Sequence, residues 1–268
     1  MKVLFRLIIA AIVAVSSLFS YCTSSSQNVI TGEEQRVGLT AEEEVLLGQQ
    51  SAPEMIAEYG GLDSDSSAAD RVKRIGEKLI SPIQDKLPYT YEFHLLDDPK
   101  TINAFALPGG QVFLTEGLYR ELKTDGQLAG VLGHEISHVV ARHGAEHIAK
   151  AQLTQGLTGA ALIATYDPEN PNSRQRAQMA VLVGQLVNMK FGREDELEAD
   201  RLGLGLAAEA GYDPRSLKDV MDVLAKAGDG KAPPEFFSTH PNPKNRKSKI
   251  DEAIATLFPD GVPSGLTP

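Results

Sequence analysis

Most of the chain carries apolar residues at helical spacing. A capping box at Thr40 predicts a helix that runs towards Tyr59, and the apolar positions after Asp65 fall on one face of a second helix. From residue 125 onward the helical period returns and persists almost to the end of the chain. It predicts helices over about 125–149, 152–165, 174–190, 193–210, 214–227 and 244–258.

Between the second helix and residue 125 the period changes to two. Tyr89, Tyr91 and Phe93 alternate with polar residues, which is typical of a half-buried strand. Residues 102–107 and 111–114 predict two further strands, joined as a hairpin through a Pro-Gly-Gly turn. This order of elements predicts an α+β fold that is mostly helical and contains a small antiparallel sheet.

The N-terminal residues predict a signal for export. Lys2 and Arg6 precede an apolar run over residues 7–19, which has the charge and length of a secretory signal and falls short of the roughly 20 residues of a membrane span. We therefore expect residues 1–21 to be a signal peptide and the protein to reach the bacterial periplasm. Residues 22–39 are polar and lack periodicity, which is typical of a tether.

Cys22 is the only cysteine of the chain and stands where the apolar run ends. Its position resembles that of the lipid-modified cysteine of a bacterial lipoprotein, although Tyr21 is bulkier than the small residue that normally precedes such a cysteine. Lipidation of Cys22 would anchor the mature protein to a membrane. The alternatives are cleavage after Ser20, which gives a soluble protein, and retention of the leader as an anchor.

Two later apolar segments, 156–164 and 177–187, are too short to span a bilayer. We expect them to form helices buried over the core, and apposition to a membrane is the alternative. No repeat with a period of about 20 to 50 residues is visible, so helical-repeat appendages are not expected.

Composition limits the classes of function. The chain has 42% apolar and 23% charged residues, the balance of a globular protein with one compact domain. Acidic residues outnumber basic ones by 36 to 26, and the net charge of −10 argues against nucleic acid as a partner. With a single cysteine in the leader, any metal must be held by His, Asp or Glu side chains.

Residues 134–138 carry the metal-binding motif H-E-x-x-H within a helical stretch. His134 and His138 are one turn apart, so both imidazoles can reach one ion from the same face of the helix. Glu135 lies beside that ion, where a base for the attacking water is needed. A pair of surface histidines is the alternative, and the apolar residues around the pair disfavour it.

A metal site of this kind needs a third protein ligand. Glu196 and Asp200 share one helix face, so the first can ligate while the second orients a ligand histidine through its free ring nitrogen. Glu194 and Glu198 have the same spacing, but Glu198 lies off the face that should pack on the motif helix. That face carries the small residues Ala199, Gly203 and Ala207. A solvated acidic helix start is a further alternative.

Four motifs occur in an order that resembles one enzyme family. They occupy residues 103–110, 134–143, 196–201 and 239–241. They resemble the zinc metallopeptidase family that includes the CAAX prenyl endopeptidase and the heat-shock membrane protease HtpX, nearest its soluble periplasmic BepA-like branch. The resemblance implies a gluzincin-like metallopeptidase domain over about 40–258, followed by a tail at 259–268. It also implies one Zn²⁺ per chain, with Glu196 as its third ligand and Glu135 as the catalytic base.

His240 lies in a rigid T-H-P segment. In the soluble branch of the family, the histidine of a similar segment can approach the zinc and block or assist its open position. The resemblance therefore implies that His240 is a fourth ligand at rest or an oxyanion donor during turnover. A loop histidine that caps the next helix is the alternative.

Four other basic or aromatic side chains are interpreted without a role in the site. His143 and His147 continue the motif helix but lie too far along its axis to reach the same ion, so we interpret them as structural. Arg246 at a helix start is interpreted as solvated, with a contribution to the region of His240 as the alternative, and His94 as a strand-surface residue.

The expected function is hydrolysis of peptide bonds in unfolded or misfolded envelope proteins. By resemblance to the substrate-binding edge of the family, an extended substrate would pair with the strand at Asn103, Ala104 and Phe105. Backbone pairing reads conformation more than sequence, so protein quality control in the cell envelope is expected. The alternative is a non-catalytic, zinc-braced, chaperone-like binding protein, although a structural zinc has no use for Glu135. The oligomeric state is not predicted.

Overall fold

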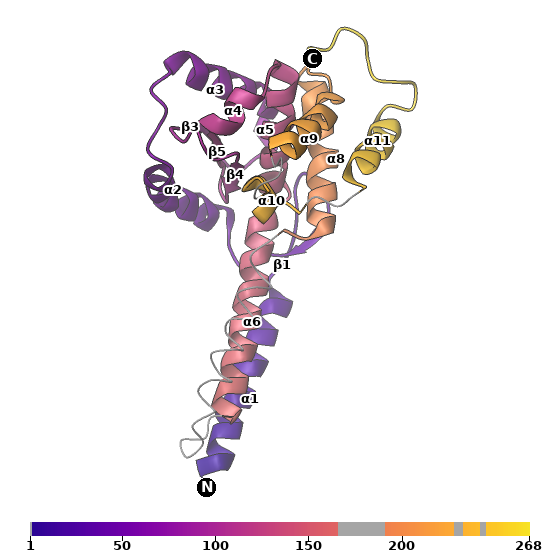
Figure 1. The fold of residues 1–268 in the computed structure, drawn as a ribbon. Helices are drawn as coiled ribbons and strands as arrows, with labels where there is room; N and C mark the ends of the chain where they lie inside the picture. The colour runs from indigo at the N-terminus through magenta and orange to yellow at the C-terminus, as the bar shows by residue number, and fades with distance from the viewer. Residues whose placement is uncertain (1, 166–190, 228–232, 242–244) are drawn as a thin grey trace. The chain divides into compact units, whose positions relative to one another are not determined.

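A computed structural model describes residues 2–165, 191–227, 233–241 and 245–268 of the chain (Figure 1). The helix expected over 174–190 and the apolar segment 177–187 lie outside these residues. Contacts divide the chain into two units. The larger comprises Val29–Thr31, Ala41–His143 and Phe191–Pro268, and the smaller comprises Met1–Asn28, Gly32–Thr40 and Gly144–Lys190.

The smaller unit is built on two long helices. Helix α1 (Lys2–Thr23) is followed by the antiparallel strands β1 (Ser25–Gln27) and β2 (Glu34–Arg36), and helix α6 (His143–Thr165) contributes all but its first residue. Ser17 of α1 faces Gly156 of α6 so closely that a Cβ on the glycine would not fit. The two helices therefore run side by side at a position where glycine removes the steric barrier.

Helix α1 has the dimensions of a membrane span. Among the described helices, it alone is long and apolar enough to cross a membrane, over Leu4–Thr23, and a signal sequence passes the same test. Residues 156–164 were expected to be buried over the core, and this is wrong: Ala160 is the one buried residue of that segment. The segment packs against α1 and leaves much of its apolar surface uncovered.

The larger unit contains the remaining elements. Its helices and strands are α2 (Ala41–Glu58), α3 (Ser66–Ile80), the 3-10 turn η1 (Gln84–Lys86), β3 (Glu92–Leu96), β4 (Ala104–Leu107), β5 (Gln111–Thr115), α4 (Glu116–Glu121), α5 (Asp125–Val140), α8 (Arg193–Glu209), α9 (Ser216–Ala227), α10 (Phe236–Thr239) and α11 (Arg246–Leu257). The mostly helical α+β class is confirmed.

The sheet of this unit has the order β3-β5-β4. Strands β4 and β5 form the expected antiparallel hairpin, with Ala104 opposite Leu114. Strand β3 pairs with β5 in parallel, so the expectation of an antiparallel sheet is wrong for this pair. Because β3 lies beside β5, the chain crosses to the far edge before it forms β4. All five residues of β5 are buried, as the central strand requires.

Helix α5 is the centre of the unit. Its residues are buried along almost the whole length, and Figure 1 shows it running between the strands and the helices α8 and α9. Gly133 of α5 meets Gly203 of α8, where an added Cβ would lie 3.0 Å from the His134 backbone nitrogen. The small-residue face expected on α8 is therefore confirmed, and it allows the two backbones to approach closely.

The helix expected over 125–149 breaks after Val140. Arg142 adopts a positive φ of 56°, and α6 begins at the next residue. The helix expected at 152–165 is part of this same α6, which runs on without interruption. The helix break at Arg142 was not visible in the apolar period because both flanking segments are helical.

The tail expected at 259–268 folds back on the domain at its last residues. Thr267 donates its N–H to the carbonyl of Gly211 and accepts from the N–H of Asp213. The N–H of Gly126, in the first turn of α5, donates to Pro268. These contacts tie the segment to the N-terminal end of the motif helix.

Candidate metal centre

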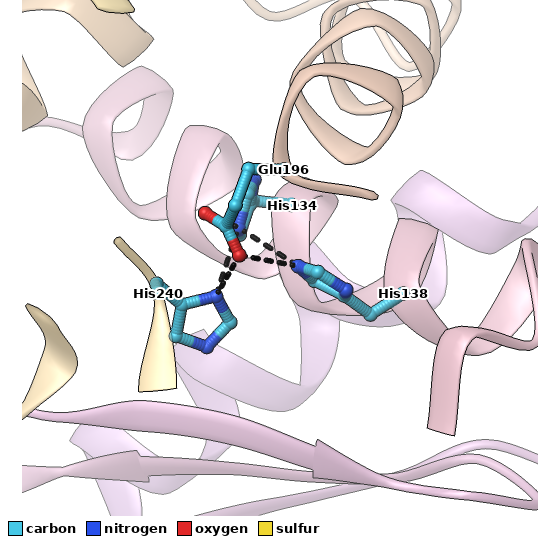
Figure 2. Close-up of side chains that lie close together, drawn as sticks. All are labelled: His134, His138, Glu196 and His240. Carbon is cyan, nitrogen blue, oxygen red and sulfur yellow. Dashed lines mark hydrogen bonds and ion pairs between the residues drawn. The ribbon is translucent and has the colours of Figure 1, made fainter. Parts of the chain in front are cut away.

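Four side chains from three parts of the larger unit converge on one point. His134 and His138 come from α5, Glu196 from the first turn of α8, and His240 from the residue after α10 (Figure 2). One donor atom from each lies within 4.8 Å of the others, and all four residues are buried. The sequence expectation placed the first three together and gave His240 as a fourth ligand at rest, and the structure brings all four into one cluster.

The distances between donor atoms suit a metal ion. His134 Nε2 lies 3.1 Å from His138 Nε2 and 3.3 Å from His240 Nδ1, and His240 Nδ1 lies 2.9 Å from Glu196 Oε1. Glu196 Oε1 is 3.5 Å from His138 Nε2. Ligands on a tetrahedral zinc with bonds of about 2.0–2.1 Å are separated by about 3.3 Å. The donor set therefore fits a divalent cation.

The protonation chemistry of the cluster points the same way. Two imidazole nitrogens in contact can share only one proton, yet His134, His138 and His240 turn ring nitrogens towards one another and towards a carboxylate. Burial opposes ionisation of Glu196, but hydrogen bonds to His138 and His240 outweigh it and lower the pKa of this carboxyl. Glu196 is thus an anion inside the protein, and the facing lone pairs are satisfied by a cation.

The outer nitrogen of His134 contacts a carboxylate. Its Nδ1 lies 3.0 Å from Asp200 Oδ1, one turn beyond Glu196 on α8. Burial opposes ionisation of Asp200, but the guanidinium of Arg246 and the contact with His134 lower its pKa. The structure thus brings Asp200 to the position that the E-x-x-x-D spacing predicts.

Arg246 is the residue that the sequence interpretation placed wrongly. Its side chain is buried instead of solvated, with 1% of its surface exposed. Its Nε and Nη2 donate to the two Asp200 oxygens at 2.9 and 2.8 Å, and Nη1 lies 3.0 Å from Glu196 Oε2. One guanidinium therefore neutralises two buried carboxylates.

His138 has a different outer partner. Its Nδ1 lies 2.9 Å from His143 Nδ1, and the His143 Nε2 lies 3.3 Å from Glu198 Oε2. The ring of His138 also stacks on Phe191 at 4.0 Å between centroids. His143 does not join the cluster, as expected from its place beyond the motif, but it contacts a ligand candidate directly, which the sequence interpretation missed.

His240 is held inside the site and not on the surface. Its ring is fully buried, stacks on Phe236 at 4.4 Å, and turns Nε2 towards Glu135 Oε1 at 3.7 Å. The interpretation as a helix-capping loop histidine is wrong, because the N-cap of α11 is Asn245 and has no side-chain cap bond. Burial opposes protonation of His240, while Glu135 and Glu196 raise its pKa above the usual range.

Glu135 points beside the cluster. It is buried, and its Oε1 atom has no hydrogen-bond partner among the described residues. A buried carboxylate oxygen without a donor is costly unless a ligand or water completes it. The oxygen is therefore free to take up a proton from a molecule bound next to the cluster.

The residues expected at the substrate edge lie on or next to β4, which is an edge strand of the sheet. Asn103 is buried, and its Nδ2 donates to Tyr59 and Glu235 at 3.3 and 3.0 Å. Ala104 is fully buried, and the half-buried Phe105 stacks on Phe113. His94, expected at the strand surface, is hydrogen-bonded to Gln111.

Comparison with known proteins identifies a matching family and several relatives. The model of peptidase family M48 matches residues 66–254. The mitochondrial metalloendopeptidase OMA1 of Schizosaccharomyces pombe is 33% identical over 92% of this chain and 72% of its own. The beta-barrel assembly-enhancing protease of Escherichia coli is 34% identical over 69% of this chain and 38% of its own, and the OMA1 of Arabidopsis thaliana is 37% identical over 61% and 32%.

The chain thus spans most of the yeast relative but only about a third of the plant relative and two fifths of the bacterial one. The family match covers every residue of the cluster and its outer partners. On this match, and with its His/Glu cluster intact, the chain belongs to peptidase family M48, a family of zinc metalloendopeptidases.

Proposed function

We propose that this protein is a zinc-dependent endopeptidase that cleaves unfolded or extended protein segments in the cell envelope. One observation carries the proposal: a buried set of metal donors lies beside Glu135, whose Oε1 atom accepts no hydrogen bond from the part of the chain that the structure describes. A site that served only to brace the fold would gain nothing from a second buried carboxylate with an oxygen that accepts no hydrogen bond from the described residues.

The residues divide the work as follows. His134, His138 and Glu196 would hold one Zn²⁺ per chain, and Asp200 would fix the tautomer of His134 through the 3.0 Å contact to its Nδ1. Zinc bound there would supply a Lewis acid for the scissile carbonyl and lower the pKa of the attacking water. Glu135 Oε1 takes the proton of that water and returns it to the leaving amine.

His240 closes the cluster in this structure. Closed sites with four protein donors are typical of structural zinc, whereas catalytic sites keep one position open. This is the observation that favours the second candidate, a metal-braced binding protein. We propose instead that the structure is a resting state in which His240 Nδ1 would be the fourth donor to the ion, since a purely structural metal site does not explain the buried Glu135 beside it.

The proposed substrates are extended segments that pair with strand β4 near Asn103, Ala104 and Phe105. Support comes from the position of β4 at the sheet edge, within the domain that carries the cluster. One relative is named for enhancing beta-barrel assembly, which suggests unfolded or misfolded envelope proteins as the substrates. Backbone pairing selects by conformation, which suits quality control.

We further propose export with residues 1–21 as a signal peptide, residues 22–39 as a tether, and Cys22 as a lipidation site that anchors the periplasmic protein. Cys22 is exposed near the end of α1, and its thiol is free. Mass spectrometry of the mature N-terminus tests this. A diacylglyceryl mass on Cys22 supports the anchor, whereas an unmodified thiol rules out the lipoprotein.

The decisive experiment pairs two substitutions. Glu135→Gln keeps the shape of the side chain but cannot accept the proton, so we expect zinc at one per chain and a loss of casein cleavage by about 10²–10⁴-fold. Glu196→Ala should lose both zinc and cleavage. Metal analysis and gel-based cleavage, with and without a chelator, measure these outcomes. Full cleavage by Glu135→Gln would refute the assigned base, and wild-type protein that holds zinc without cleaving would favour the binding protein.

A second substitution tests the role of His240. If His240 closes the fourth position, His240→Ala should leave zinc bound by three residues and raise the initial rate of casein cleavage. If it instead donates to the developing oxyanion, the same substitution should lower kcat by about 10²–10³-fold. An unchanged rate would exclude both roles.

A further inference from the structure

The contact between His138 and His143 depends on the break between α5 and α6. In an unbroken helix, five residues turn through about 500°, which would place His143 about 140° around the axis from His138. The positive φ of 56° at Arg142 redirects the backbone instead. The result is a buried His143 whose Nδ1 lies 2.9 Å from His138 Nδ1.

A separate set of bonds holds this strained residue in place. The Arg142 Nε donates to Glu44 Oε1 at 2.8 Å, and Arg142 Nη2 reaches the same oxygen. Glu44 is buried in α2 and also accepts a 2.6 Å hydrogen bond from the Tyr89 hydroxyl. A non-glycine residue keeps a left-handed backbone only where its surroundings fix it. Here Glu44 fixes it, and His143 is placed as a consequence.

The protons on His138 and His143 can be assigned from the proposed metal site. His138 turns Nε2 into the donor cluster, so that nitrogen carries no proton when it binds a cation, and its Nδ1 is protonated. Nδ1 of His138 must then donate to Nδ1 of His143. His143 in turn carries its proton on Nε2, which faces Glu198 Oε2 at 3.3 Å. Each of these contacts therefore pairs one donor with one acceptor.

We propose that His143 and Glu198 are positioning residues of the metal centre: together they hold His138 in the tautomer and ring orientation that leave Nε2 available to the ion. The inference rests on the proposed zinc site but not on catalysis. Asp200 contacts the ligand candidate His134 directly. Glu198 is a second carboxylate outside the cluster, and it acts on His138 through the imidazole of His143.

The test measures zinc affinity of the purified full-length chain by competition with a chromophoric chelator. Loss of an outer partner typically weakens metal affinity by about 10- to 100-fold, and we expect this loss for His143→Ala. His143→Asn retains an acceptor near the Nδ1 position and should lose less. Glu198→Gln should weaken binding in the wild-type background and have no further effect when combined with His143→Ala.

Matched controls come from the same two helices. His147→Gln changes the histidine one turn further along α6, and Glu194→Gln changes an exposed carboxylate in the first turn of α8, so both should bind zinc as the wild-type chain does. Thermal melts of the metal-free proteins report whether each variant folds, and His143→Asn carries the test if His143→Ala does not.

Wild-type affinity in His143→Ala, or additive losses in the double variant, would overturn the proposal. Because no substrate enters these measurements, the outcome is separate from that of the proposed function. If the protein cleaves no substrate but shows the non-additive losses of zinc affinity, the positioning role of His143 and Glu198 stands and the peptidase assignment fails.

Discussion

The two histidines of the motif helix are oriented by different chemistry on the two sides of the cluster. On one side, the Nδ1 of His134 contacts Asp200 directly, and Arg246 neutralises that carboxylate. On the other, the Nδ1 of His138 contacts a second imidazole, and the carboxylate of Glu198 stands one residue further out. We refer to these as the His134 side and the His138 side.

The two carboxylates are buried to different extents, which explains why the two histidines have different outer partners. Asp200 is 2% exposed, so its charge must be matched inside the protein, and the equally buried guanidinium of Arg246 does so. Glu198 has 17% of its side chain exposed, and besides His143 it lies 3.9 Å from the exposed Arg201. On the His138 side the imidazole of His143 lies between the ligand and Glu198, so this carboxylate does not have to be buried beside the ligand.

The largest effect should come from removing the cation of the His134 side. Arg246→Met keeps the approximate volume but leaves Asp200 and Glu196 without their shared partner. Breaking a buried ion pair in this way costs about 3–5 kcal/mol, and we expect that loss in the free energy of unfolding of the metal-free protein. Urea denaturation at neutral pH measures it.

Arg201→Met is the matched control on the His138 side. It removes an exposed partner of Glu198, and such pairs contribute about 0–1 kcal/mol. Losses of equal size in Arg246→Met and Arg201→Met would contradict the assignment of depth as the cause of the difference between the two sides.

How far each side could be predicted from the sequence also differs. His134 and His138 follow from helix geometry, because a spacing of four residues fixes a shared face. The same spacing, with the small residues on α8, favours Glu196 and Asp200 over Glu194 and Glu198, and the resemblance to the family names Glu196 as the third ligand. The antiparallel hairpin followed equally from local turn chemistry.

The parts that escaped prediction depend on distant residues. The break that brings His143 back requires Glu44, which is 98 positions before Arg142, and the burial of Arg246 requires Asp200, which is 46 positions before it. The parallel pairing of β3 with β5 is likewise tertiary, since strand period carries no information on the neighbour.

A smaller effect is expected where α8 approaches the His134 side. Gly203→Ala would place a Cβ 3.0 Å from the backbone of Gly133 and His134, and both are backbone atoms that cannot rotate away. We expect a loss of about 1–3 kcal/mol in unfolding free energy, together with weaker zinc binding as Asp200 is pushed from His134.

Gly205→Ala provides the control within the same helix. No atom of the described residues lies within 4 Å of a Cβ at this position, so replacing glycine in a helix interior should stabilise the protein by about 0.5–1 kcal/mol. Chemical denaturation of both variants and chelator competition separate the two cases. Equal behaviour of the two alanine variants would mean that the close approach of α5 and α8 is not what sets the His134 side.

The smallest effect should come from the brace of the His138 side. Tyr89→Phe removes the hydroxyl that donates to Glu44 but leaves Arg142 bound to the same carboxylate, so a loss of about 1 kcal/mol in unfolding free energy is expected. Tyr91→Phe is the matched control, because the Tyr91 hydroxyl is buried without a hydrogen-bond partner among the described residues, and its removal should cost nothing or stabilise. Urea midpoints of the two variants measure the difference. If Tyr91→Phe proved as costly as Tyr89→Phe, packing around the hydroxyl oxygen and not the bond to Glu44 would account for the loss, and the contact between Glu44 and Arg142 would hold the bend without help from Tyr89.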